Sequence, residues 1–316
     1  MAQDGGPDAG GDGLRRVLDF PEERTLGAIL SSFRRGGGDP TLRTAGRWAG
    51  EWWVAWPTPE GPVTARFEQL TERRIEVSTW GGGATWLLER AYGLLGGDDD
   101  VSGFVPHHPV VAEAWRRLPG WRVPRSGLVV HALVPAVIEQ KVTGQEAFSG
   151  QRRLVRKYGT PAPGPGGQLG LVVAPDAAGW ARIPSWEWLR ASVDAARSDT
   201  VMRALVSPGR LEECAELPLA EARRRLRSIP GIGVWTAAEV AQRALGDPDS
   251  PSFGDYHVAK NIGWALIGEE VDDDGLAELL EPYAGHRYRV QRLLELAGLR
   301  RPRRGARMSP RTHLPR

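Results

Sequence analysis

Hydrophobic and polar residues alternate in three segments near the start of the chain, and this period of two predicts β-strands. In the second segment Val63, Ala65 and Phe67 fall on one face, as expected for a strand that covers a core. The segment 84–95 then changes to helical spacing and ends at two glycines. The three predicted strands are EWWVAW at 51–56, VTARFEQL at 63–70 and RRIEVSTW at 73–80.

From about Val110 onward, hydrophobic residues recur with the 3.6-residue period of α-helices. One apolar stripe between Leu128 and Val137 contains Pro135, which predicts a kink or a break in that helix. The Gly- and Pro-rich segment 159–170 predicts a flexible insertion loop. Further helices are expected over 185–206 and 211–228, whereas VDDDG at 271–275 reads as a solvated loop.

The pattern divides the chain into four parts. We predict a mostly α protein with a smaller N-terminal α/β domain that contains an antiparallel sheet. The predicted parts are a disordered N-terminus at 1–13, the α/β domain at 14–105, a helical region at 106–300 and a basic tail at 301–316.

Composition narrows the class of protein. The 316 residues include one cysteine, Cys214, which excludes disulfides within the chain, cysteine-ligated zinc and four-cysteine iron–sulfur clusters. No apolar run reaches the roughly 18 residues of a membrane span, and the first residues do not resemble a signal peptide, so a cytoplasmic location is expected. The net charge is +2, yet residues 286–316 hold ten arginines and one acid. This basic end indicates either a polyanionic partner or a solvated tail.

The stretch LRSIPGIGVWTAAEVAQRAL at 226–245 predicts two helices joined by the short turn 229–233. Glycine at positions 231 and 233 permits a positive φ and leaves no side chain between the backbone and a ligand. The amides at the start of the second helix would then point outward and could bind an anion the size of a phosphate. The alternative is an ordinary turn between two helices.

Asp255 precedes a second helical stripe formed by Val258, Ile262 and Leu266. A carboxylate in this position can accept hydrogen bonds from the first amides of the helix. Capping alone would explain the residue, because such caps are common.

The two features together are more specific than either alone. A hairpin PGIGxWTA followed about twenty residues later by GDYH resembles the helix-hairpin-helix DNA glycosylase superfamily, and most closely the DNA-3-methyladenine glycosylase II family. The resemblance covers roughly 110–300, and the earlier part matches only in its pattern. It implies a DNA glycosylase that flips a damaged base from duplex DNA and hydrolyses its N-glycosidic bond. An alkylated purine is the expected base, and a cytoplasmic, nucleoid-associated monomer that needs no cofactor is the expected form.

The resemblance also implies roles for individual residues. Asp255 would be the catalytic anion beside the sugar. Relatives that cleave the DNA strand carry a lysine where this chain has Trp235, which implies hydrolysis without lyase activity. The predicted substrate pocket contains Trp235, Glu239 and Tyr288, and the predicted DNA contacts are Gln140, Lys141, Gly231, Ile232, Gly233 and Thr236. The carbonyls of Ile229 and Ile232 could hold a monovalent cation.

Several positions leave alternatives open. Trp235 and Tyr288 could pack in the core, and Glu239 could point to solvent. Lys141 stands where the family often has an apolar wedge, and Glu239 where relatives can have an aromatic residue. These departures allow a non-catalytic DNA-binding or damage-sensing protein, or a glycosylase for deaminated or oxidised bases.

Overall fold

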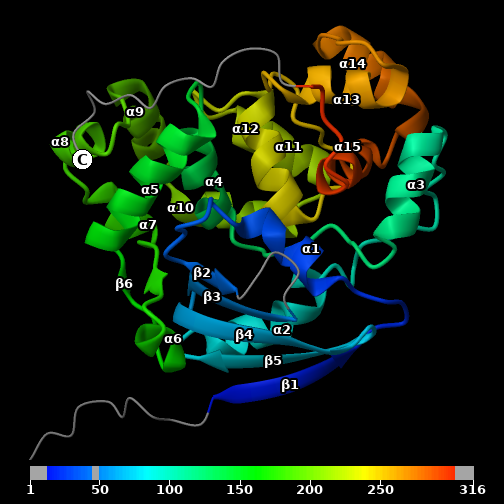
Figure 1. The fold of residues 1–316 in the computed structure, drawn as a ribbon. Coiled ribbons are helices and arrows are strands. Elements are labelled where there is room, and N and C mark those ends of the chain that lie inside the picture. Colours follow the sequence, from blue (N-terminus) through cyan, green and yellow to red (C-terminus); the bar gives the residue numbers. More distant parts are fainter. Residues whose placement is uncertain (1–12, 45–49, 303–316) are drawn as a thin grey trace, which may run out of the picture.

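The computed structural model describes residues 13–44 and 50–302, so the predictions for 1–12 and for most of the basic tail lie outside it. Its N-terminal part contains a five-stranded antiparallel sheet with the strand order β1-β5-β4-β3-β2 (Figure 1). The three predicted strands are confirmed, and two edge strands are added. The bounds are Leu14–Asp19 (β1), Leu42–Thr44 (β2), Glu51–Thr58 (β3), Gly61–Thr71 (β4) and Arg74–Trp80 (β5).

The register brings the apolar residues of the central strands into line. Val54 of β3 pairs with Ala65 of β4, and Phe67 pairs with Val77 of β5. The helix α2 (Ala84–Leu94), predicted at 84–95, packs against this sheet. Short helices α1 (Leu26–Leu30) and η1 (Ser31–Phe33) add to the same core.

The remainder of the described chain is mainly helical, which confirms the predicted mostly α fold. Most of these helices lie above the sheet in Figure 1, with α13 and α14 at the end of the molecule away from it, while α6 lies beside the sheet. They are α3 (Pro109–Arg117), α4 (Val129–Ile138), α5 (Gly144–Tyr158), α6 (Pro165–Gln168), α7 (Ala177–Ala181), α8 (Ser185–Arg190), α9 (Ala195–Ala204), α10 (Pro208–Glu212), η2 (Glu213–Glu216), α11 (Leu219–Arg227), α12 (Val234–Val240), the π-helical turn η3 (Ala241–Leu245), α13 (Val258–Ile267), α14 (Asp273–Leu280), η4 (Glu281–Tyr283) and α15 (Arg287–Leu296).

Three expectations about this region need correction. The helix α4 continues through Pro135, so a break there was wrong. The segment 159–170 is not a free loop, because it contains α6 and the strand β6 (Thr160–Pro161), which pairs with β7 (Val172–Val173). The loop predicted at 271–275 instead begins α14, where Asp272 caps the helix by accepting a hydrogen bond from the amide of Gly275 at 3.0 Å.

The second helix of the hairpin and the helix that follows Asp255 pack in different apolar clusters. Buried alanines of the second hairpin helix, among them Ala237 and Ala241, lie in a core built around α4. The helix α13, which follows Asp255, packs in a second cluster with residues of α3, α14 and α15. The candidate site therefore lies where two separately packed groups of helices meet.

The N-terminal sheet also contacts the helical region. The ring of His131 on α4 lies 5.7 Å from that of Trp56 on β3. The predicted domain boundary near residue 105 stays a prediction. None of the helices in 13–44 and 50–302 is long and apolar enough to cross a membrane.

The half-buried position of His131, beside Trp56 and Arg35, predicts a pH-dependent stability. Burial, assisted by Arg35, lowers the pKa of His131 from 6.5 to about 4. The unfolded chain therefore binds a proton between these values while the folded chain does not, so stability is complete above pH 6.5 and falls as the pH drops toward 4. The loss amounts to about 3 kcal/mol at 1.36 kcal/mol per pKa unit.

Urea unfolding at pH 7 and pH 4 of the wild type and of His131→Gln measures this contribution. Carboxylates titrate in both proteins, so the difference between the two pH dependences reports His131 alone. Equal loss of stability in the two proteins would contradict the expectation.

Candidate active site

The turn between α11 and α12 contains one glycine with a positive φ and one with an extended backbone. Gly231 has a φ of +97°, and a β-carbon there would lie 2.4 Å from the hydroxyl of Thr200. Gly233 has an extended backbone with φ −91° and ψ −171°, so the expected use of a positive φ is correct only for Gly231. A β-carbon on Gly233 would meet no atom within 4 Å. Gly233 thus leaves the outer face of the turn open to an approaching ligand.

The side chain of Gln140, just beyond α4, holds this turn in place. Its amide nitrogen donates to the carbonyl of Gly231 at 3.0 Å and to the hydroxyl of Thr236 at 2.8 Å. Thr236 is buried, and its predicted DNA contact stays a prediction. The first helical hydrogen bond of α12 runs from the amide of Ala237 to Gly233, which leaves the three preceding amides at the open end of the helix.

Lys141 lies next to Gln140 in an unusual backbone conformation. It is exposed and has a φ of +56°, which costs a residue with a β-carbon about 1 kcal/mol or more. Strained residues of this kind cluster at functional sites. Because the neighbouring Gln140 bonds to Gly231, the long cationic side chain of Lys141 begins close to the hairpin turn.

Asp255 accepts hydrogen bonds at the start of α13, but the N-cap of this helix is His257, two residues further on, so the predicted N-cap position of Asp255 is wrong. Its Oδ1 accepts hydrogen bonds from the amides of His257 at 2.7 Å and Val258 at 3.0 Å. No hydrogen bond among the described residues involves its Oδ2. One carboxylate oxygen is therefore fixed by the backbone, while the half-buried side chain keeps the other available.

The loop that carries Asp255 lies against the hairpin. A β-carbon on Gly254 would lie 3.9 Å from that of Trp235, the second residue of α12. Trp235 is half-buried, and its indole nitrogen is buried without a hydrogen-bond partner among the described residues. Its predicted contact with a base stays a prediction.

Glu239, one turn after Trp235, is buried, so the alternative in which it points to solvent is wrong. Its carboxylate accepts hydrogen bonds from Arg243 and from the hydroxyl of Ser252, each at 2.7 Å. Burial alone would raise the pKa of Glu239, but Arg243 and the bond from Ser252 outweigh it and lower this pKa. Glu239 therefore stays charged, and its carboxylate already bonds to neighbouring protein groups.

Tyr288 on α15 is 3% exposed and belongs to a different apolar cluster from the hairpin. Its ring makes an edge contact with Trp121, with centroids 6.4 Å apart, and burial raises its pKa to about 12. These contacts agree with the alternative in which Tyr288 packs in the core. Its predicted place in a base pocket stays a prediction.

The hairpin carbonyls fit a cation only in part. The carbonyl of Ile229 already accepts a hydrogen bond from the amide of Ile232 at 3.0 Å, although a carbonyl oxygen has a second lone pair. Across residues 13–44 and 50–302, no group of three or more His, Cys, Asp or Glu side chains is arranged to hold a metal ion.

Three residues near Asp255 were not singled out from the sequence. Tyr256 is 69% exposed, and the ammonium of Lys260 lies 3.9 Å from the centre of its ring. Asp273 accepts a hydrogen bond from the amide of Gly254 at 2.9 Å, and Ser252 contacts Glu239. Tyr256 could have been found as a large side chain next to Asp255, whereas the contacts of Ser252 and Asp273 depend on the tertiary structure.

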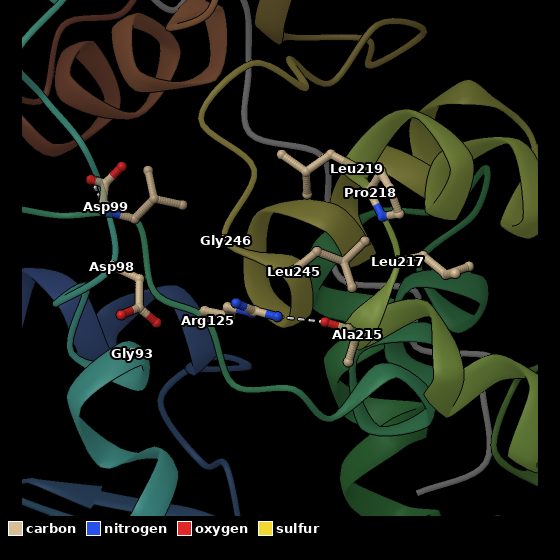
Figure 2. Close-up of a pocket in the computed structure, with 11 residues that line it drawn as sticks. Gly93, Asp98, Asp99, Arg125, Ala215, Leu217, Pro218, Leu219, Leu245 and Gly246 are labelled. Carbon is tan, nitrogen blue, oxygen red and sulfur yellow. Dashed lines mark hydrogen bonds between the residues drawn. The ribbon is translucent and has the colours of Figure 1, made fainter.

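A separate cavity of about 240 Å³ contains none of the predicted site residues (Figure 2). It lies between the end of α2, the segment 215–219 and the glycine after η3, and the guanidinium of Arg125 crosses it to the carbonyl of Ala215 at 2.6 Å. The candidate site at the hairpin and the Asp255 loop is separate from this cavity.

Known proteins match the chain in sequence over part of its length. No protein-family model matches it. A Mycobacterium tuberculosis protein named probable bifunctional transcriptional activator/DNA repair enzyme AlkA is 33% identical over 180 residues. The match covers 54% of this chain and 32% of that protein, so the chain spans about a third of the length of this relative.

Solved structures match over most of the chain. A 3-methyladenine DNA-glycosylase from Archaeoglobus fulgidus gives a TM-score of 0.69 at 18% identity, over 89% of this chain and 97% of that one. An 8-oxoguanine glycosylase/lyase from Clostridium acetobutylicum, in complex with double-stranded DNA, gives 0.64 at 11% identity, over 88% and 96%. These matches confirm the predicted fold, which the chain shares with both of these glycosylase structures.

Proposed function

We propose that this protein is a monofunctional DNA glycosylase that hydrolyses the N-glycosidic bond of damaged bases, with alkylated purines as its substrates. The observation that carries the proposal is the position of Asp255. One oxygen of its carboxylate is fixed by two backbone amides, the other takes part in no hydrogen bond among the described residues, and its loop lies against the hairpin. The names of the curated relative and of the Archaeoglobus fulgidus structure agree with a DNA-repair glycosylase that acts on 3-methyladenine.

The hairpin would bind the DNA backbone beside the lesion. The amides at the open end of α12 can donate hydrogen bonds to a phosphate, and Gly233 allows the backbone to come close. Lys141 would add a charge-assisted contact near the same strand. Gln140 would act from behind the turn, because its side chain already holds Gly231 and Thr236.

The chemistry follows from the charge of the reacting groups. Flipping the base out of the duplex costs a few kcal/mol. An alkylated purine is positively charged and leaves readily, while the sugar develops oxocarbenium character. The free oxygen of Asp255 would stabilise this charge and could orient the attacking water. Trp235 would stack on the cationic base by a cation–π contact.

The absence of a lysine at position 235 supports hydrolysis without strand cleavage. The nearby amine of Lys260 lies over the ring of Tyr256, where it is held by a cation–π contact. We propose that no cofactor takes part in the reaction, that Ile229 and Ile232 can hold a structural monovalent cation, and that the protein acts as a monomer on the nucleoid.

Base release from duplex DNA carrying a panel of lesions tests the proposal. We expect release of methylated purines, with abasic sites that break only on treatment with alkali. Strand breaks without alkali would contradict the monofunctional mechanism. Release of only deaminated or oxidised bases would contradict the proposed substrate, and binding without release of any base would identify a non-catalytic DNA-binding protein.

A further inference from the structure

A buried polar cluster supports the loop that carries Asp255. Ser252, three residues earlier, is 1% exposed. Its hydroxyl donates to Glu239 at 2.7 Å and accepts from the side-chain amides of Gln242 at 3.0 Å and Gln291 at 3.2 Å. A serine hydroxyl has one hydrogen and two lone pairs, so these bonds saturate it. Glu239 is the partner that accepts its hydrogen.

Glu239 is itself held from the opposite side. Its second carboxylate oxygen accepts from Arg243 at 2.7 Å, and the Nε of Arg243 donates to the carbonyl of Ser32 at 2.8 Å. A continuous chain of hydrogen bonds therefore runs from η1 in the N-terminal part, through α12, to Ser252. Buried charged groups with complete hydrogen bonding fix geometry rather than add much stability.

The position of Ser252 sets the path of the residues after it. Its amide donates to Gln291 at 2.9 Å, and its carbonyl accepts from the amide of Asp255 at 3.2 Å. The intervening Gly254 is held by Asp273. The loop is thus fixed on both sides of the bend that presents Asp255.

We propose that Glu239 and Ser252 are positioning residues, which hold the loop so that the carboxylate of Asp255 faces the reacting sugar. The inference rests on the proposed function. It means that Glu239, which stands where relatives can have an aromatic residue, positions the Asp255 loop and does not recognise the base. A displacement of about 1 Å at a reacting group can lower a rate by about a hundredfold.

A double-mutant cycle tests whether the pair acts through Asp255. In single-turnover release of a methylated purine, we expect Ser252→Ala to lower the rate about a hundredfold with an unchanged Kd for DNA. In the Asp255→Asn background the same substitution should change the rate little, because the group being positioned has lost its charge. An equal fold-loss in both backgrounds would overturn the proposal.

Glu239→Gln and Glu187→Gln form a matched pair. Glu187 on α8 is 7% exposed, as Glu239 is, and is ion-paired with Lys157 and Arg190, and no hydrogen bond or ion pair among the described residues joins it to the hairpin or to the Asp255 loop. We expect Glu239→Gln to lose activity as Ser252→Ala does, and Glu187→Gln to keep it. Equal activity of the two glutamine variants would contradict the inference.

Hydrogen exchange of the backbone amides in 252–258 gives a readout that needs no substrate. We expect at least tenfold faster exchange there in Ser252→Ala, with unchanged exchange in α4 and in Glu187→Gln. Unchanged exchange in this segment would overturn the inference. If the wild type releases no base, the proposed function fails, and this measurement still decides whether the cluster fixes the loop.

Discussion

Asp255→Asn is expected to lower the rate of base release at least 10²–10³-fold while leaving DNA binding intact. Asparagine keeps an oxygen that can accept from the amides of His257 and Val258, so the start of α13 should be preserved. What is lost is the negative charge opposite the developing oxocarbenium ion. Single-turnover release of a methylated purine, together with a binding titration on the same duplex, measures the two effects separately.

Asp272→Asn is the control for this substitution. Asp272 caps the neighbouring helix α14 through one hydrogen bond to the amide of Gly275, so the same loss of charge occurs at a helix start without reactive chemistry. We expect this variant to release bases at the wild-type rate. If Asp255→Asn also kept the wild-type rate, Asp255 would not be the catalytic anion.

The central part of the fold was predictable because its pattern is local. Each of β3, β4 and β5 has large apolar residues buried at alternate positions, such as Trp52, Val54 and Trp56 in β3, so the period of two is visible in the sequence even though three consecutive residues of each strand are buried. β1 was missed because five of its six residues are exposed, which leaves no apolar face to detect. Its position is fixed instead by pairing with β5, a contact between residues about sixty positions apart.

The segment 159–170 shows why composition misled the prediction. Its glycines and prolines indicate flexibility, but its backbone is held by distant residues. The hydroxyl of Thr64 donates to the carbonyl of Pro163 at 2.6 Å, and the guanidinium of Arg43 donates to the carbonyl of Leu169 at 2.8 Å. Tertiary hydrogen bonds of this kind leave no periodic signal in the sequence.

The difference between local patterns and contacts of distant residues also separates the predicted from the unpredicted parts of the site. The hydrogen bonds from the amides of His257 and Val258 to Asp255, and the turn at Gly231, depend on residues within a few positions, so the sequence was sufficient to predict both. The pairing of Glu239 with Ser252 depends on how the loop folds back onto α12, which the spacing did not reveal. The helical spacing around Tyr288 was sufficient to predict that it lies on a helix. It did not predict which neighbours that side chain packs against, and in the structure its ring contacts that of Trp121.

Gly231→Ala is expected to destabilise the protein by about 3 kcal/mol, whereas Gly233→Ala should change its stability by less than about 1 kcal/mol. The difference follows from the backbone. At position 231 a β-carbon faces both a φ of +97° and the side chain of Thr200 at 2.4 Å. At position 233 the backbone is extended and the β-carbon would meet open space. Urea unfolding of the two variants measures this difference directly.

DNA binding should place the same two variants in the opposite order. Among correctly folded molecules, Gly233→Ala should bind DNA more weakly than Gly231→Ala. The β-carbon of Gly233→Ala would project from the outer face of the turn, where the proposed function places the phosphate. Loss of one charge-assisted hydrogen bond, about 1.5 kcal/mol, would weaken binding roughly tenfold in a well-folded protein. If Gly233→Ala bound DNA as tightly as the wild type, the turn amides would not be the phosphate contact. Asp255 and Trp235 would then have to meet DNA that is held by other parts of the surface.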